Sequence, residues 1–195
     1  VGNHKDVPCR RGQLPILDAY SVARLLAPFG HVAKDRSDVR YALACPVLFQ
    51  RVPTRGKQPI GHVADDIVAV FGSSQTRPGE PDYIDGMRCG RLLAESGFRV
   101  ATGGYAGLME AVSRGAADAG GTVIAATAPE LFPSRAGANE GVHIEAPQPT
   151  LSLRIGRQID DSVASIALPG SIGTLTELMV AWNTSFIEAL ELRPP

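Results

Sequence analysis

The sequence predicts a three-layer α/β domain built on a parallel sheet, preceded by an N-terminal extension that is poorly readable. From residue 66 onward, short apolar runs alternate with longer segments of helical spacing. Three of these runs end in turns rich in glycine or serine, at 72–74, 103–107 and 170–174. Because ligands bind a parallel sheet at the carboxyl ends of its strands, we expect these turns to share one rim.

The first half of the domain is predicted to contain two strand–helix units and a third strand. The run at 67–71 is short and continuously apolar, as expected of a strand buried on both faces. A loop rich in proline and glycine leads to a helix at 83–96, and a strand follows at 98–102. Two glycines close a second helix at 108–119, before a third strand at 122–127.

The second half begins with a long loop at 128–150, which contains four prolines and two glycines. Loops of this length in compact domains are usually functional or mobile. A helix at 151–161, a strand at 163–168 and a helix at 173–190 complete the pattern. A doubly wound domain normally adds a strand after such a helix, so we expect the domain to continue beyond Pro195.

The bulk properties are those of a globular domain, with 44% hydrophobic and 20% charged residues in 195. No apolar run approaches the ~20 residues of a membrane span, and no secretory signal is visible. The three cysteines are widely spaced and form no disulfide or zinc framework. We therefore expect a cytoplasmic protein without a membrane partner.

The extension at 1–64 has a charge balance opposite to that of the domain at 65–195. It carries ten Lys and Arg against four Asp and Glu, whereas the rest carries nine against sixteen. The basic residues are scattered and lack interleaved aromatics, which favours a solvated appendage over a nucleic-acid-binding arm. A helix at 14–26 and a strand or buried segment at 42–49 are the only elements expected there, and no function is assigned to them.

The motif at 169–177, Pro-Gly-Ser-Ile-Gly-Thr-Leu-Thr-Glu, predicts an anion cradle between a strand and the last helix. Its glycines permit a tight turn and close approach of a ligand to the backbone. The amides at the helix start attract a phosphate, and Glu177 is expected in the first turn beside it. In the alternative interpretation, Thr174 and Glu177 form a capping box and bind no ligand.

Arg154 is predicted to lie on the same rim by counting residues along the chain. From it, eight residues of helix descend about 12 Å, and five residues of strand then rise about 16 Å. A guanidinium at this point can clamp a phosphate or orient a substrate. The alternative is a structural arginine that pairs with Asp160, Asp161 or solvent.

Several other chemistries lack their residues. No Gly-Lys-Ser/Thr motif is present, and the glycines at 103–107 do not match a dinucleotide fingerprint. No His, Cys and carboxylate cluster has metal-ligand spacing, and His143 is isolated in the long loop. All three lysines lie in the extension, which leaves no Schiff-base lysine in the domain. We therefore predict neither a metal nor a cofactor.

These motifs together resemble the Lonely Guy (LOG) family, often mislabelled lysine decarboxylase. Gly103-Gly-Tyr-Ala-Gly107-Leu-Met-Glu110, Arg154 and the 169–177 motif carry the resemblance, which covers about residues 66–192. It implies a Rossmann-like dimer that hydrolyses the N-glycosidic bond of a nucleoside 5′-monophosphate, such as AMP or a cytokinin ribotide. The products would be the free base and ribose 5-phosphate.

The resemblance also implies a set of site residues. Arg154 and Glu177 correspond to the family's catalytic pair. The substrate- and phosphate-binding candidates lie in the three turns and at the start of the following helix: Gly72, Ser73, Ser74, Gly103, Gly104, Gly107, Glu110, Gly170, Ser171, Gly173 and Thr174.

Three positions depart from the family pattern. Tyr105 and Ser171 each replace a glycine, and Ile155 replaces the lysine that follows the arginine in cytokinin-activating members. Related branches include molybdenum-cofactor carriers and nucleotide sensors, which bind without hydrolysis. A non-catalytic carrier is therefore the alternative function. The apolar residues of the last helix and the resemblance both predict a homodimer formed near that helix. In the alternative interpretation, these residues cover the strand that is expected after Pro195.

Overall fold

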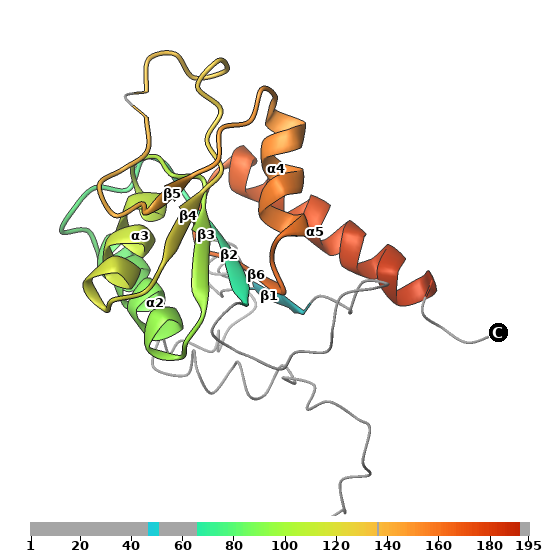
Figure 1. The fold of residues 1–195 in the computed structure, drawn as a ribbon, viewed down its shortest axis with the longest axis horizontal. Coiled ribbons are helices and arrows are strands. Elements are labelled where there is room, and N and C mark those ends of the chain that lie inside the picture. Colours follow the sequence, from blue (N-terminus) through green and yellow to red (C-terminus); the bar gives the residue numbers. More distant parts are fainter. Residues whose placement is uncertain (1–46, 51–65, 136, 192–195) are drawn as a thin grey trace, which may run out of the picture.

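The computed structural model describes residues 47–50, 66–135 and 137–191; for 47–50 and 188–191 it describes the backbone alone. Within these ranges the fold is the predicted three-layer α/β domain (Figure 1). The helix expected at 14–26 lies outside the described residues.

Six strands form one sheet in the order β1-β6-β2-β3-β4-β5. Five of them run parallel, as predicted, and β1 pairs antiparallel with β6 at one edge. The strands are β1 (Val47–Gln50), β2 (Ile67–Phe71), β3 (Arg99–Thr102), β4 (Val123–Ala125), β5 (Ile144–Glu145) and β6 (Ala164–Ala167).

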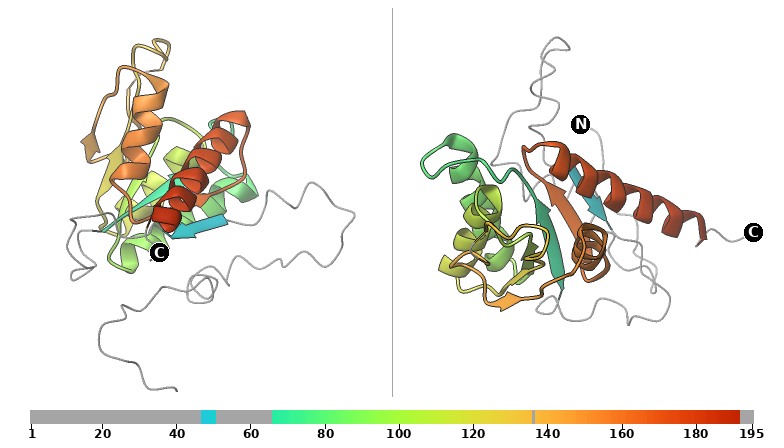
Figure 2. Two further views of the ribbon diagram at one scale, coloured as in Figure 1. Left: turned by 90° about the vertical axis from the view of Figure 1, so that its right-hand side faces the viewer. Right: turned by 90° about the horizontal axis from the view of Figure 1, so that it is seen from above.

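Two pairs of helices cover the two faces of the sheet, which gives the three layers (Figure 2). One pair is α2 (Pro81–Glu95) with α3 (Leu108–Asp118), and the other is α4 (Leu151–Asp160) with α5 (Ile172–Glu191). A connection between two parallel strands is almost always right-handed. The direction in which the chain moves along the sheet therefore fixes the face that each connecting helix covers.

Strand β2 shows how the core is built, because its side chains alternate between the two faces. Val68 and Val70 pack with Leu93 of α2 and Val112 of α3 on one side. The other residues of the strand face α4 and α5, where they meet Ile155, Ile159 and Ala181. All five β2 residues are buried, which explains the continuous apolar run in the sequence.

The structure differs from the expected elements in two places. The long loop at 128–150 contains the short strand β5, which extends the sheet beyond β4. Two residues give too little periodicity to be recognised in a sequence. The strand or buried segment expected at 42–49 is described only over β1, which adds an antiparallel strand at the edge of the predicted parallel sheet. Antiparallel edge strands on parallel sheets are common.

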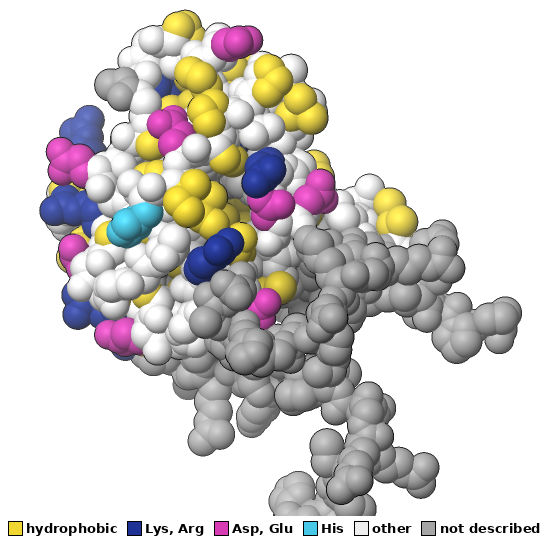
Figure 3. Space-filling view, viewed as in Figure 1, with side chains coloured by type: hydrophobic (Ala, Val, Ile, Leu, Met, Phe, Trp, Pro, Cys, Tyr) yellow, Lys and Arg dark blue, Asp and Glu magenta, His cyan; other side chains and the backbone are white. Residues whose placement is uncertain are grey.

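No helix in the described part of the chain is long and apolar enough to cross a membrane. The same residues hold no group of three or more His, Cys, Asp and Glu that could bind a metal ion. On the face seen in Figure 3, described Lys and Arg side chains are interspersed with Asp and Glu. This mixture of charges forms no continuous basic surface of the kind that binds nucleic acid.

Candidate functional site

The site lies where the sheet order reverses direction. Strands β6, β2 and β3 are adjacent, and the chain leaves β2 toward β3 on one side and later returns to β6 on the other. The turns after these strands therefore meet at the carboxyl edge, which is the usual ligand position in such sheets.

Backbone hydrogen bonds join the three turns. The Ser73 amide donates to the Pro169 carbonyl at 3.0 Å, and the Leu108 amide donates to the Ser73 carbonyl at 2.7 Å. Gly107 has a φ of +76°, and a Cβ at this position would overlap the Ser73 carbonyl oxygen. A side chain at 107 would thus separate the turns, so this glycine is required for the rim to form.

The two glycines of the turn after β6 have different surroundings. A Cβ on Gly170 would overlap Thr174, whose buried side chain packs under the turn. Gly173 has nothing within 4 Å of the position that a Cβ would occupy. The exposed surface at Gly173 is therefore open to a ligand at the start of α5.

Arg154 and Glu177 form a buried ion pair beneath this rim. Arg154 Nη1 donates to Glu177 Oε1 at 3.1 Å, and Arg154 Nε donates to the Ala126 carbonyl at 2.8 Å. Both residues are more than 90% buried. The two were predicted to share one rim, and the structure brings them into direct contact.

Two further neighbours hold the Arg154 guanidinium in place. Its Nη2 lies 3.9 Å from Met109 Sδ, and a Cβ on Gly103 would overlap the same nitrogen. Gly103 thus provides space for the arginine, in addition to any contact with a ligand. This role follows from packing and could not be inferred from the motif.

Burial determines the electrostatics of the pair. Desolvation raises the pKa of Glu177 above its ordinary value, and the neighbouring Arg154 charge opposes this shift without cancelling it. A carboxylate with a raised pKa is a better general base than an exposed one. Buried ion pairs contribute little net stability, which makes this pair at the carboxyl edge of the sheet a candidate functional site.

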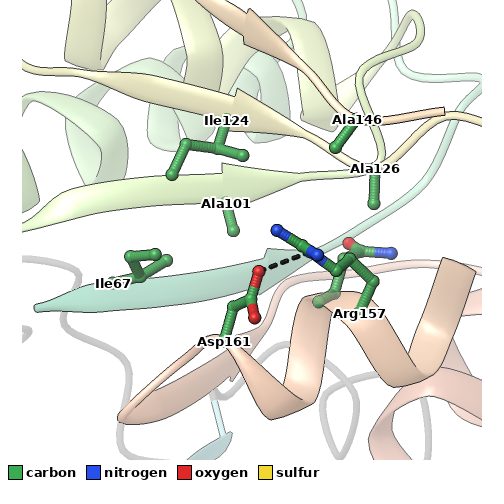
Figure 4. Close-up of a pocket in the computed structure, with 8 residues that line it drawn as sticks. Ile67, Ala101, Ile124, Ala126, Ala146, Arg157 and Asp161 are labelled. Carbon is green, nitrogen blue, oxygen red and sulfur yellow. Dashed lines mark ion pairs between the residues drawn. The ribbon is translucent and has the colours of Figure 1, made fainter.

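The contacts expected in the two structural alternatives differ from those that the structure shows. Helix α5 begins at Ile172, so Thr174 lies inside the helix and cannot be its N-cap. Glu177 lies in the second turn, and the prediction that placed it in the first turn is wrong. Asp161 pairs with Arg157, one turn away along α4 (Figure 4). Arg154 pairs with Glu177 instead.

A small cavity lies between α4 and the sheet, beside the Arg157–Asp161 pair (Figure 4). Its volume is about 10 Å³, and the buried Gln158 Oε1 on its wall has no hydrogen-bond partner among the described residues. The space corresponds to one water molecule. It is too small to be part of the substrate site.

The other predicted residues have mainly structural contacts. Gly104 has a φ of +78°, and its amide donates to Thr102 Oγ1 at 3.1 Å. The Glu110 carboxylate accepts from the Tyr83 hydroxyl at 3.1 Å. The remaining candidates, Gly72, Ser74 and Ser171, lie in the turns, with Ser74 and Ser171 exposed.

A pocket of about 330 Å³ adjoins the rim, and sequence reasoning missed most of it. Ser74, Ala106 and Glu110 form one side, while Arg135 and Asn139 come from the long loop. Asn139 Nδ2 donates to the Gly104 and Tyr105 carbonyls, both at 3.0 Å. The length and proline content of the loop were the only signals that pointed to it.

The sheet order, the three joined turns and the buried Arg154–Glu177 pair define a LOG-like protein of the Rossmann type. The chain belongs to the SLOG cluster4 family, whose model matches residues 65–187. This confirms the resemblance and the fold class predicted from the motifs. Among curated proteins, no match is found.

Three solved structures show the fold of proteins that are similar to this chain. TM1055 is 27% identical over 60% of this chain and 69% of its own, with a TM-score of 0.54. The molybdenum cofactor binding protein of Rippkaea orientalis is 27% identical over 62% and 73%, with a TM-score of 0.54. The molybdenum cofactor carrier protein of Chlamydomonas reinhardtii is 25% identical over 61% and 71%, with a TM-score of 0.51.

Proposed function

We propose that this chain hydrolyses the N-glycosidic bond of a nucleoside 5′-monophosphate, releasing the base and ribose 5-phosphate. The observation that supports this function is the buried Arg154–Glu177 pair beneath the open turn at Gly173. The phosphate binds the amides at the start of α5, and the sugar extends from it toward the carboxylate.

The reaction breaks the bond between the ribosyl C1′ and the base nitrogen. The electron pair leaves with the base, which takes a proton from solvent, and positive charge develops on the sugar. Glu177 stabilises this charge and accepts a proton from the water whose oxygen bonds to C1′. Arg154 keeps the carboxylate in position, while the phosphate cradle fixes the other end of the substrate.

The direct test is base release by the full chain. AMP and isopentenyladenosine monophosphate, within a panel of other nucleoside monophosphates, are incubated with the protein, and the free base is quantified by chromatography. We expect release above the blank for at least one of them. A panel that gives no free base at any monophosphate would exclude the hydrolase.

Gly173→Ala tests the phosphate cradle without disturbing the fold. Because nothing lies within 4 Å of the added methyl, the melting temperature is expected to stay the same or rise slightly. A phosphate seated on the turn would meet the methyl, so AMP affinity is expected to fall about tenfold or more. Calorimetry of AMP binding measures the effect.

Gly156→Ala is the matched control, because its added methyl in α4 also has room, with Asp160 Oδ2 as its nearest neighbour at 3.9 Å. It should leave AMP affinity unchanged. Equal affinity in both variants would show that the phosphate binds elsewhere.

A carrier for a phosphorylated ligand is the second candidate function. The names of the Rippkaea orientalis and Chlamydomonas reinhardtii neighbours support it, as do Tyr105 and Ser171, which alter the glycine motifs. A ligand that co-purifies with the protein, identified by mass spectrometry, together with tight binding and no turnover, would favour the carrier over the hydrolase.

We further propose that the active form is a homodimer that uses the outer face of α5, which projects beyond the edge of the sheet (Figure 2). Apolar side chains follow helical spacing along this face and are 41–77% exposed: Ile172, Leu175, Met179, Trp182 and Phe186. Such a stripe is expected to bury itself against a second copy.

The double variant Met179→Glu/Phe186→Glu is expected to convert the dimer to monomers, because it places charges within the stripe. Both residues are exposed in the monomer, so the fold should persist. Light scattering measures the mass, and circular dichroism checks the fold. A monomeric wild-type protein would refute the dimer.

A further inference from the structure

The pocket beside the rim contains a cation that the proposed reaction does not use. Arg135 lines this pocket of about 330 Å³, together with Ser74 and Tyr105 from the turns. Within the described part of the chain, no carboxylate pairs with the Arg135 guanidinium. The volume lies at the lower end of the range for small-molecule sites.

Two aromatic rings position this guanidinium. Arg135 Cζ lies 4.6 Å from the centroid of the Tyr105 ring and 4.2 Å from that of Phe132. The two rings meet at an interplanar angle of 76°, with centroids 5.6 Å apart, so Cζ lies in the corner between them. Cation–π contacts of this kind orient a guanidinium and leave its N–H groups available to a ligand.

Tyr105 connects this cluster to the rim. Its hydroxyl accepts a hydrogen bond from the Ala128 amide at 2.8 Å, which fixes the start of the long loop. Its ring centroid also lies 5.9 Å from Arg154 Cζ. The two guanidinium carbons are therefore within about 10.5 Å of each other, and both lie near the same ring.

The acid in the same pocket does not neutralise Arg135. The Glu110 carboxylate accepts from the Tyr83 hydroxyl at 3.1 Å and lies 3.9 Å from Arg114. Its charge is thus shared with partners on α2 and α3. The group that would complement Arg135 is an anion supplied by the ligand.

We propose that Arg135 binds a second anionic group of the ligand, so that the ligand carries two separated anions, as in a nucleoside bisphosphate or a dinucleotide. One phosphate occupies the turn at 170–174, as in the proposed function on which this inference rests, and the other reaches past Tyr105 to Arg135. Tyr105, which replaces a family glycine, is the positioning residue for this subsite.

The test compares adenosine 3′,5′-bisphosphate with AMP by calorimetry. We expect the full chain to bind the bisphosphate about tenfold or more tightly than AMP, since a charge-assisted hydrogen bond is added. Arg135→Gln should abolish this preference and leave AMP affinity within about twofold. Arg91→Gln is the matched control, because Arg91 is exposed on α2 and away from the pocket.

Two Tyr105 variants separate positioning from simple packing. Tyr105→Phe keeps the ring and should retain most of the preference for the bisphosphate. Tyr105→Leu removes the ring and should lose the preference while AMP still binds. Equal preference in the leucine variant would show that Tyr105 does not position Arg135.

The outcomes distinguish this inference from the proposed function. Normal AMP binding with an undiminished bisphosphate preference in Arg135→Gln would overturn the second subsite alone. If neither nucleotide binds and the panel of monophosphates releases no base, the proposed function fails, and inorganic pyrophosphate becomes the probe. It should then protect Arg135 from phenylglyoxal, as mapped by mass spectrometry, and lack of protection would overturn the subsite as well.

Discussion

Replacing Glu177 with glutamine is expected to lower base release by about 10²- to 10⁴-fold while AMP binding remains measurable. Glutamine has nearly the same shape and can still accept the hydrogen bond from Arg154 Nη1. It has no negative charge to stabilise the sugar cation and cannot take a proton from water. An interaction made mainly in the transition state lowers kcat when it is removed, so single-turnover and steady-state kinetics together measure the effect.

Glu95→Gln provides the control, since Glu95 is exposed at the end of α2 and distant in sequence from the rim. It should leave kcat unchanged. A Glu177→Gln protein with wild-type turnover would mean that the carboxylate is not catalytic. If AMP binding and turnover were lost together, Glu177 would be required for ligand binding. The carrier function would then gain support.

Replacing Arg154 with alanine is expected to destabilise the fold by about 3–5 kcal/mol at neutral pH and to abolish base release. The change removes the donors to the Ala126 carbonyl and to Glu177, and it leaves the carboxylate buried without its partner. The pKa of Glu177, already raised by burial, should rise further because the neighbouring positive charge is gone.

This destabilisation should depend on pH in a defined direction. A carboxyl group whose folded-state pKa is raised stabilises the fold fully below its unfolded pKa, and that contribution is lost as the pH rises through the folded pKa. The deficit of Arg154→Ala is therefore expected to be smallest near or below the ordinary pKa of 4.5 and largest at neutral pH. Urea unfolding of both proteins across this range measures it.

The double variant Arg154→Ala/Glu177→Gln separates the ion pair from ordinary packing. It should be more stable at neutral pH than Arg154→Ala alone, because no unpaired charge remains buried. Arg91→Ala, at an exposed position on α2, should change stability by less than about 0.5 kcal/mol. A pH-independent deficit in Arg154→Ala would mean that lost packing, and not the buried charge, dominates.

The three-layer fold and the location of the rim could be predicted from local patterns. The run at 67–71 is apolar at every position because the strand is covered on both faces, and this burial is visible in sequence. The rim followed from the glycine turns, since parallel strands all end at one edge. Residue counting also placed Arg154 near Glu177, because helix and strand have fixed rises per residue.

Contacts between residues distant in sequence could be decided only by the tertiary structure. The ion pair joins residues 23 positions apart, and the competing partner Asp161 was nearer in sequence but pairs with Arg157 instead. The antiparallel pairing of β1 and the two-residue strand β5 also depend on edges that the rest of the sheet provides. Such pairing leaves no periodicity in the strand itself.

Local sequence patterns were sufficient to predict the fold class and the family resemblance, and they identified the turn at 170–174 as a candidate anion site. The contact between Tyr105, a departure from the family motif, and Arg135 of the long loop could be seen only in the folded domain. Local propensity depends on a few neighbouring residues. The contact of Arg135 with two aromatic rings depends instead on the path of the long loop in the folded domain. Hydrogen bonds from Ala128 and Asn139 to residues more than twenty positions earlier in the chain fix this path.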